Sequence, residues 1–145
     1  MNLTKHDYEI IQSSKQEIEW VESEINRLNQ TLLAMPGEPE SLLNYCIKEN
    51  DEVIAGINAC FYFGEFLWIS VLFVKEAYRG KGLGSMLMSK VEEVAKEKGA
   101  KISHLHAFEF NRVTDFYLQQ GYEVYGVLDD CPAKYKHYFL KKWLT

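Results

Sequence analysis

The sequence predicts one mixed α/β domain, and three observations support this fold class. Strand-like and helix-like segments alternate along the 145 residues. Residues 66–74 are apolar at nearly every position and lead into a glycine-rich turn and an amphipathic helix. The chain is 47% hydrophobic and 14% aromatic, which is enough for a sizeable core. Because this length is typical of one compact domain, we assign residues 1–145 to a single domain.

Composition and charge argue against several function classes. The 16 Lys and Arg residues are outnumbered by 21 Asp and Glu, which disfavours a general nucleic-acid binder. No apolar run approaches the roughly 20 residues of a membrane-spanning helix, and the N-terminus lacks the apolar core of a signal peptide. Three scattered cysteines are typical of free thiols rather than of a disulfide framework or metal site. We therefore expect a cytoplasmic protein that binds neither metal, nucleic acid nor membrane.

The first half of the chain is predicted to contain a helix followed by strands. After a short strand at residues 8–12, residues 14–35 have helical periodicity, as one long helix or two short ones ending at Pro36-Gly37. The apolar residues that share one face of this helix are Ile18, Val21, Ile25, Leu28 and Leu32. Residues 43–48, 53–63 and 66–74 are strand candidates. We place residues 66–74 at the sheet centre, covered on both faces.

The second half is predicted to continue with two helices and three strands. Residues 85–98 form a helix that stops at Gly99, and residues 112–120 form one that stops at Gly121. The strands are assigned to residues 102–108, 122–127 and 135–140.

The most informative segment for function is Arg79-Gly80-Lys81-Gly82-Leu83-Gly84, between a strand and a helix. The first turn of a helix has unpaired N–H groups and a partial positive charge, and glycines let an anion approach them closely. A phosphate or pyrophosphate is therefore the expected ligand at residues 80–85, although the glycines alone would also make a tight turn. The G-x-G-x-G spacing fits neither the Walker motif nor the dinucleotide fingerprint.

These residues resemble a known family. The loop is similar to the Q/R-x-x-G-x-G/A signature of the GNAT superfamily of N-acetyltransferases. Asn111, Phe116-Tyr117 and Gly121-Tyr122 resemble the family's N-x-x-x-x-F-Y-x-x-x-G-F/Y element. The resemblance covers about residues 53–140. It implies a GNAT-like, mostly antiparallel twisted sheet with a splayed parallel strand pair and flanking helices.

The resemblance also implies where acetyl-coenzyme A binds. Its diphosphate would lie at the glycine loop, and its amide-containing arm would pair with the strand before the loop. A backbone N–H near Leu72 or Phe73 would then stabilise the oxyanion. The residues implied in cofactor binding are Leu72, Phe73, Val74, Arg79, Gly80, Lys81, Gly82, Leu83, Gly84, Ser85, Asn111 and Tyr117. Asn111 equally fits a cap of the following helix.

For catalysis, the resemblance points to Tyr117 as the acid that protonates the leaving thiolate, although packing or cofactor contact would also suit this residue. Glu65 is a candidate base, and a solvated turn glutamate is the alternative. His106, Glu109 and a water chain are further options for the base.

The resemblance implies direct transfer of the acetyl group to an amine, and the acidic balance of the chain favours a cationic small molecule as acceptor. The alternatives are a protein N-acetyltransferase, a non-catalytic acyl-coenzyme A sensor, and an unrelated domain that binds a phosphate ligand. Because family members often pair through their last strands, the resemblance also suggests a homodimer.

Overall fold

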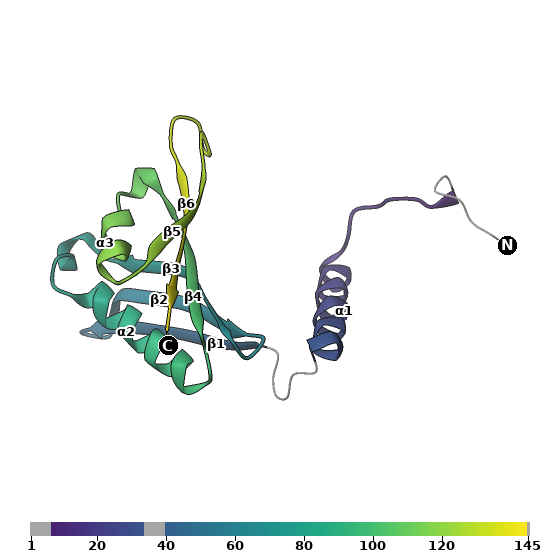
Figure 1. Ribbon diagram of the computed structural model, residues 1–145, viewed down its shortest axis with the longest axis horizontal. Coiled ribbons are helices and arrows are strands. Elements are labelled where there is room, and N and C mark those ends of the chain that lie inside the picture. Colours follow the sequence, from purple (N-terminus) through teal and green to yellow (C-terminus); the bar gives the residue numbers. More distant parts are fainter. Residues whose placement is uncertain (1–6, 34–39, 145) are drawn as a thin grey trace. The chain divides into compact units, whose positions relative to one another are not determined.

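A computed structural model describes residues 7–33 and 40–144 of the chain (Figure 1). The chain divides into two compact units, Met1–Pro36 and Gly37–Thr145. No helix within residues 7–33 or 40–144 is long and apolar enough to cross a membrane.

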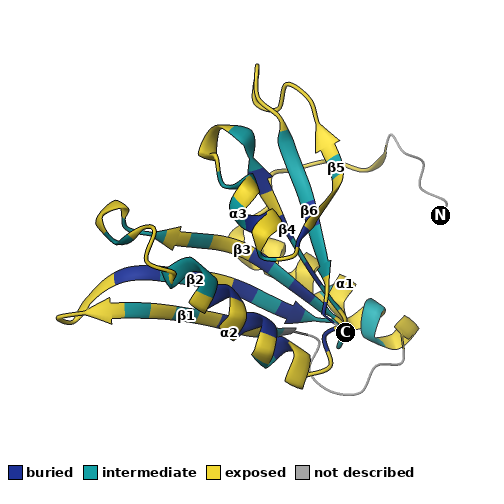
Figure 2. Cartoon of the chain, turned by 60° about the vertical axis from the view of Figure 1, so that its left-hand side comes forward, coloured by how far each residue is buried: buried dark blue, intermediate teal, exposed yellow. Residues whose placement is uncertain are grey.

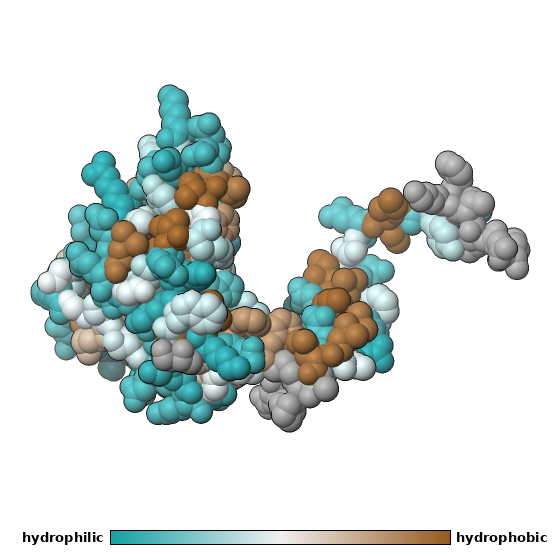
Figure 3. All heavy atoms as spheres, viewed as in Figure 1, coloured by the Kyte–Doolittle hydropathy of each residue, from teal (hydrophilic) through white to brown (hydrophobic). Residues whose placement is uncertain are grey.

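The first unit contains helix α1 (Lys15–Leu33), which confirms the predicted helix as one long helix. Residues 34 and 35 of the predicted helix lie outside the described ranges. Its start is stabilised by a capping box: the Glu17 N–H donates to Ser14 Oγ at 3.3 Å, and the Ser14 N–H donates to Glu17 Oε1 at 2.8 Å. No residue of α1 is buried. Its predicted apolar face is exposed, from 49% at Ile25 to 71% at Leu32, and forms a brown stripe in Figure 3. The strand predicted at residues 8–12 is wrong, since these residues form no regular element.

The second unit is built on a six-stranded mixed sheet with strand order β1-β2-β3-β4-β6-β5. The strands are β1 (Glu40–Glu49), β2 (Glu52–Tyr62), β3 (Phe66–Val74), β4 (Ile102–Phe108), β5 (Glu123–Leu128) and β6 (His137–Trp143). All neighbouring strands are antiparallel except β3 and β4, which are connected through helix α2 (Leu83–Glu97) and run parallel. This topology confirms the predicted fold class.

Strands β3 and β4 separate part of the way along β3. They pair only over Phe66–Ile69 and Ile102–Leu105, and Figure 2 shows β1–β3 and β4–β6 spreading apart beyond that point. We call Phe66–Ile69 the closed half of β3 and Ser70–Val74 the open half. Ser70, the first residue of the open half, forms a β-bulge, because Ile69 pairs with Ala59 of β2 and Val71 with the adjacent Asn58.

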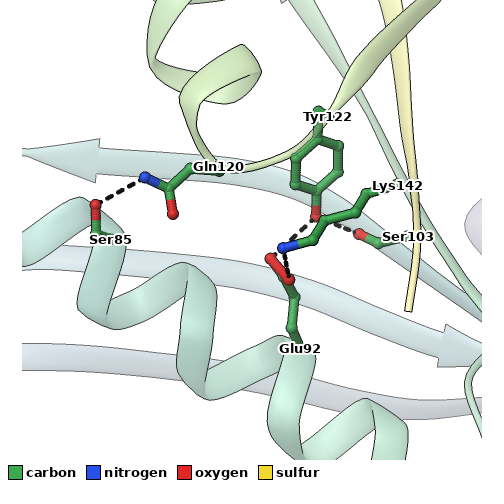
Figure 4. A network of polar contacts seen from close by, with 6 residues as sticks. All are labelled: Ser85, Glu92, Ser103, Gln120, Tyr122 and Lys142. Atoms are coloured by element: carbon green, nitrogen blue, oxygen red, sulfur yellow. Dashed lines mark hydrogen bonds and ion pairs between the residues drawn. The ribbon is translucent and has the colours of Figure 1, made fainter. Parts of the chain in front are cut away.

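The main core lies between the sheet and the helices α2 and α3 (Thr114–Gln119). Its fully buried members include Ile57, Leu67, Met88, Leu105 and Leu140. A polar network also joins α2 to the sheet (Figure 4). Lys142 Nζ lies 2.6 Å from Glu92 Oε1, and the Tyr122 hydroxyl lies 2.6 Å from Ser103 Oγ and 3.4 Å from Glu92 Oε2.

Two sequence predictions need correction. Strand β3 is central, but it is not covered on both faces: Val71 is 51% and Phe73 56% exposed on the face away from the core. Helix α3 begins at Thr114 rather than at residue 112, because residues 109–111 form a 3₁₀ turn and Arg112 has a left-handed φ of 54°.

Candidate active site

The site is centred on the open half of β3. Along this half, the strand pairs with β2 on one edge only, because its pairing with β4 ends at Ile69. The edge of this half that faces β4 therefore presents main-chain N–H and C=O groups with no strand partner. An extended, amide-containing ligand can pair with such an edge as an added strand.

The glycine loop lies directly after this open edge. Gly80 has φ +76° and Gly82 has φ +84°, a left-handed conformation that favours glycine at both positions. A Cβ on either residue would meet no atom within 4 Å, so packing does not explain these glycines. Gly82 is the N-cap of α2 and has no side-chain cap hydrogen bond. The loop thus places main-chain donors at a helix start with open space beside them, as an anion requires.

Close packing fixes the first turn of α2 in the fold. A Cβ on Gly84 would lie 3.1 Å from Phe116 Cζ and 3.9 Å from a methyl carbon of Leu72, so Gly84 permits α2 to approach both α3 and β3. Gln120 Nε2 donates to Ser85 Oγ at 2.8 Å (Figure 4). Through these contacts, the helix start, the open half of β3 and α3 form one arrangement.

Two cations border the loop. Arg79 Nε donates to the Val74 carbonyl at 2.8 Å, and its guanidinium carbon lies 5.8 Å from the centre of the Phe73 ring. Lys81 Nζ lies 5.4 Å from the centre of the Tyr78 ring. Both residues are exposed and add positive charge beside the main-chain donors.

Tyr117 comes from α3, one residue after the Phe116 that contacts Gly84. It is only 7% exposed, and its ring packs 5.2 Å from Phe116 and 6.2 Å from Tyr122, centre to centre. Burial raises the pKa of its hydroxyl above the usual value, so the group keeps its proton at neutral pH. Its hydroxyl has no hydrogen bond to any residue of the described ranges, and it can therefore donate to a ligand.

Two predicted site residues are placed differently. Glu65 precedes the closed half of β3, at the opposite end of the strand from the loop, and pairs with Lys101 Nζ at 3.1 Å. Asn111 is exposed in the 3₁₀ turn before α3, whose N-cap is Val113 rather than Asn111. The capping alternative for Asn111 is therefore wrong, whereas contact with a cofactor stays a prediction.

The face of the sheet away from α2 and α3 carries a cluster of aromatic rings and histidines beside the point where β3 and β4 separate. The His106 ring packs 4.7 Å from Trp68, 4.9 Å from His137 and 4.5 Å from Phe139, centre to centre. Sequence reasoning proposed His106 but missed Trp68 and His137. Only the alternation of side chains along β3 and β6 signalled that they share this face. No group of three or more His, Cys, Asp or Glu side chains in the described parts of the chain is arranged to hold a metal ion.

Comparisons with known proteins agree on one family. The model of the acetyltransferase (GNAT) family matches residues 6–122. A thialysine N-epsilon-acetyltransferase of Bos taurus is 31% identical over 97 residues, which cover 62% of this chain and 51% of that protein. The chain thus spans about half the length of this curated relative.

Solved structures share the fold. The crystal structure of an acetyltransferase from Bacillus cereus ATCC 14579 is 28% identical and covers 95% of this chain and 99% of its own, with a TM-score of 0.82. An aminoglycoside 6'-N-acetyltransferase complexed with coenzyme A is 15% identical and covers 94% of this chain and 98% of its own, with a TM-score of 0.63. At this low identity the second likeness supports the fold alone.

Proposed function

Because the chain belongs to the acetyltransferase (GNAT) family, we propose that it transfers the acetyl group of acetyl-coenzyme A to the nitrogen of an amine. The observation that carries this proposal is the unpaired edge of β3 leading directly into a glycine-rich helix start. These two features suit the two parts of coenzyme A, an amide-containing arm and a diphosphate.

The proposed binding mode uses main-chain groups. The N–H groups of residues 82–85 face the diphosphate, with Arg79 and Lys81 adding positive charge. The amides of the arm pair with the open half of β3 around Leu72, Phe73 and Val74. Asn111 is proposed to contact the cofactor from the 3₁₀ turn. The aminoglycoside 6'-N-acetyltransferase that shares the fold was solved in complex with coenzyme A, which is consistent with coenzyme A as the ligand.

The proposed reaction is direct attack of the amine on the thioester carbonyl. A β3 backbone N–H near Leu72 or Phe73 stabilises the oxyanion that forms. The Tyr117 hydroxyl protonates the thiolate as the C–S bond breaks, and its raised pKa keeps that proton available at neutral pH. The position of Glu65 gives no support to its predicted role as a base, because its carboxylate pairs with Lys101.

We propose a small cationic amine as acceptor. A thialysine N-epsilon-acetyltransferase is among the relatives, and the net charge of −5 is compatible with a cationic substrate.

A homodimer is also expected, since the edge strand β5 exposes Tyr125 and Leu128 by 51% and 47%. Analytical ultracentrifugation tests this second expectation.

The test is release of free thiol from acetyl-coenzyme A in the presence of thialysine, lysine, spermidine and a lysine-containing peptide. We expect amine-dependent release, which Tyr117→Phe lowers roughly 100-fold in kcat. Tight coenzyme A binding with no release for any amine would instead indicate a sensor domain. Stabilisation by ATP or NAD but not by coenzyme A would indicate a different phosphate ligand.

A further inference from the structure

The proposed reaction lacks a group that accepts the proton of the attacking amine. Two carboxylates near the strands are already engaged. Glu65 pairs with Lys101, and Glu109 accepts hydrogen bonds from the Lys136 N–H at 3.2 Å and the Tyr138 hydroxyl at 3.4 Å. The group that accepts this proton should lie where β3 and β4 separate. In the proposed binding mode, the coenzyme A arm pairs with the open half of β3, which puts its acetyl end near that point.

His106 occupies this point. It follows Leu105, the last residue of β4 that pairs with β3, and its side chain is exposed on the face away from α2 and α3. The ring is held by Trp68 on β3 and by Phe139 and His137 on β6, at centre-to-centre distances of 4.5–4.9 Å. Packing on three sides fixes the orientation of the imidazole while leaving it open to an incoming molecule.

The neighbouring histidines differ from His106 in their hydrogen bonding. His104 Nε2 lies 2.7 Å from the Tyr62 hydroxyl and is therefore engaged. His137 Nε2 is buried and has no hydrogen-bond partner among the described residues, so it is poorly placed to take a proton from a substrate. His106 is the exposed member of the three.

The surroundings of His106 favour its neutral form. Partial burial of the ring, and then the charge of His137, lower its pKa below the usual value. The titratable groups on this face are Cys60 and Tyr62 on β2, His104 on β4, His137 and Lys141 on β6, and Glu123 and Tyr125 on β5; Glu123 lies 3.9 Å from Lys141. A neutral imidazole at neutral pH is able to accept a proton.

We propose that His106 is the general base that takes the proton from the attacking amine; this inference rests on the acetyl transfer proposed above. As the N–C bond forms, one amine proton passes to an imidazole nitrogen of His106. The C–S bond breaks with its electron pair on sulfur, and Tyr117 supplies the proton that completes the thiol. Solvent then carries a proton from the imidazolium to the Tyr117 phenolate, so both groups return to their starting forms.

The test compares His106→Gln with His104→Gln, a matched variant on the same face of the same strand. With the amine that the wild-type enzyme acetylates fastest among thialysine, lysine and spermidine, we expect His106→Gln to lower kcat roughly 100-fold at pH 7. It should also remove the inflection in log kcat below neutral pH, and the affinity for coenzyme A should be unchanged. His104→Gln should keep that inflection.

Failure of this inference can be told apart from failure of the proposed function. A wild-type protein that acetylates an amine while His106→Gln has the same kcat and pH profile would overturn the role of His106 alone. An equal loss of the inflection in both variants would overturn it too, because it would indicate a structural effect. A wild-type protein that binds coenzyme A but acetylates no amine would overturn acetyl transfer, and the role of His106 with it.

Discussion

The two halves of β3 differ in what their main chain does. The closed half, Phe66–Ile69, has a strand partner on both edges, and Leu67 within it is fully buried. The open half, Ser70–Val74, has a partner on one edge, and Val71 and Phe73 are more than half exposed. One strand therefore anchors the fold at its start and offers a binding edge at its end. This contrast predicts that substitutions in the two halves affect different properties.

The largest effect is expected in the closed half. Leu67→Ala leaves a cavity in the core and should lower the free energy of unfolding by about 4 kcal/mol. Val71→Ala in the open half should lower it by about 0.5 kcal/mol, since the side chain is already half exposed. Urea denaturation measures both values, and equal losses would abolish the distinction between the two halves.

The next effect concerns the network that ties the closed half to α2, in which Ser103 pairs with Leu67 and bonds to Tyr122. Lys142→Met leaves the Glu92 carboxylate, whose side chain is 10% exposed, without its ion-pair partner. We expect a loss of about 3 kcal/mol in unfolding free energy. The double variant Lys142→Met, Glu92→Leu should recover most of this loss, and no recovery would argue against a buried charge as its cause.

A smaller effect is expected at the loop after the open half. Gly82→Val forces a β-branched residue into a left-handed conformation at the N-cap of α2. Without coenzyme A the loop relieves this strain, about 2 kcal/mol, by leaving the binding conformation, which should weaken coenzyme A binding roughly 30-fold by calorimetry. Gly126→Ala on β5 is the control, since its Cβ would make ordinary contact with Phe139 at 3.6 Å. Unchanged affinity in Gly82→Val would remove the loop from the binding site.

The smallest effect is a dependence of folding stability on pH, which arises from two histidines of β4. His104 is paired with the closed half, whereas His106 lies just beyond the paired residues. Burial lowers the folded-state pKa of both residues below 6.5. The unfolded chain therefore takes up protons first as the pH falls. Their contribution to stability is present above pH 6.5 and is lost as the pH falls through the folded-state values. Thermal unfolding from pH 7.5 to 5 should show this decline, and the double variant His104→Gln, His106→Gln should flatten it.

The sequence allowed accurate prediction where local chemistry sets the structure. The bounds of β3 and β4 match the predicted ones, and Gly99 and Gly121 have the left-handed φ values expected of helix stops, 104° and 95°. The bulge at Ser70 could not be predicted, because residues on both sides of it are apolar and the change of face leaves no pattern. The exposure of Val71 and Phe73 was missed for the same reason.

The candidate site was predictable in part. The glycine loop and Tyr117 were found because a motif identifies them, and the structure gathers the loop, the open half of β3 and α3 together. The ring cluster around His106 was only partly visible, since Trp68 and His137 are 69 positions apart and both reach His106 only through the order of strands in the sheet. Pairing between distant strands depends on tertiary packing rather than on local sequence.

The central claim is that the open half of β3 and the start of α2 form the binding edge for coenzyme A. Amide hydrogen exchange measured residue by residue, with and without coenzyme A, tests it most directly. We expect slower exchange at amides within residues 70–74 and 80–85 when coenzyme A is present, and no change at Leu67. Protection elsewhere with none in these two segments would contradict the account.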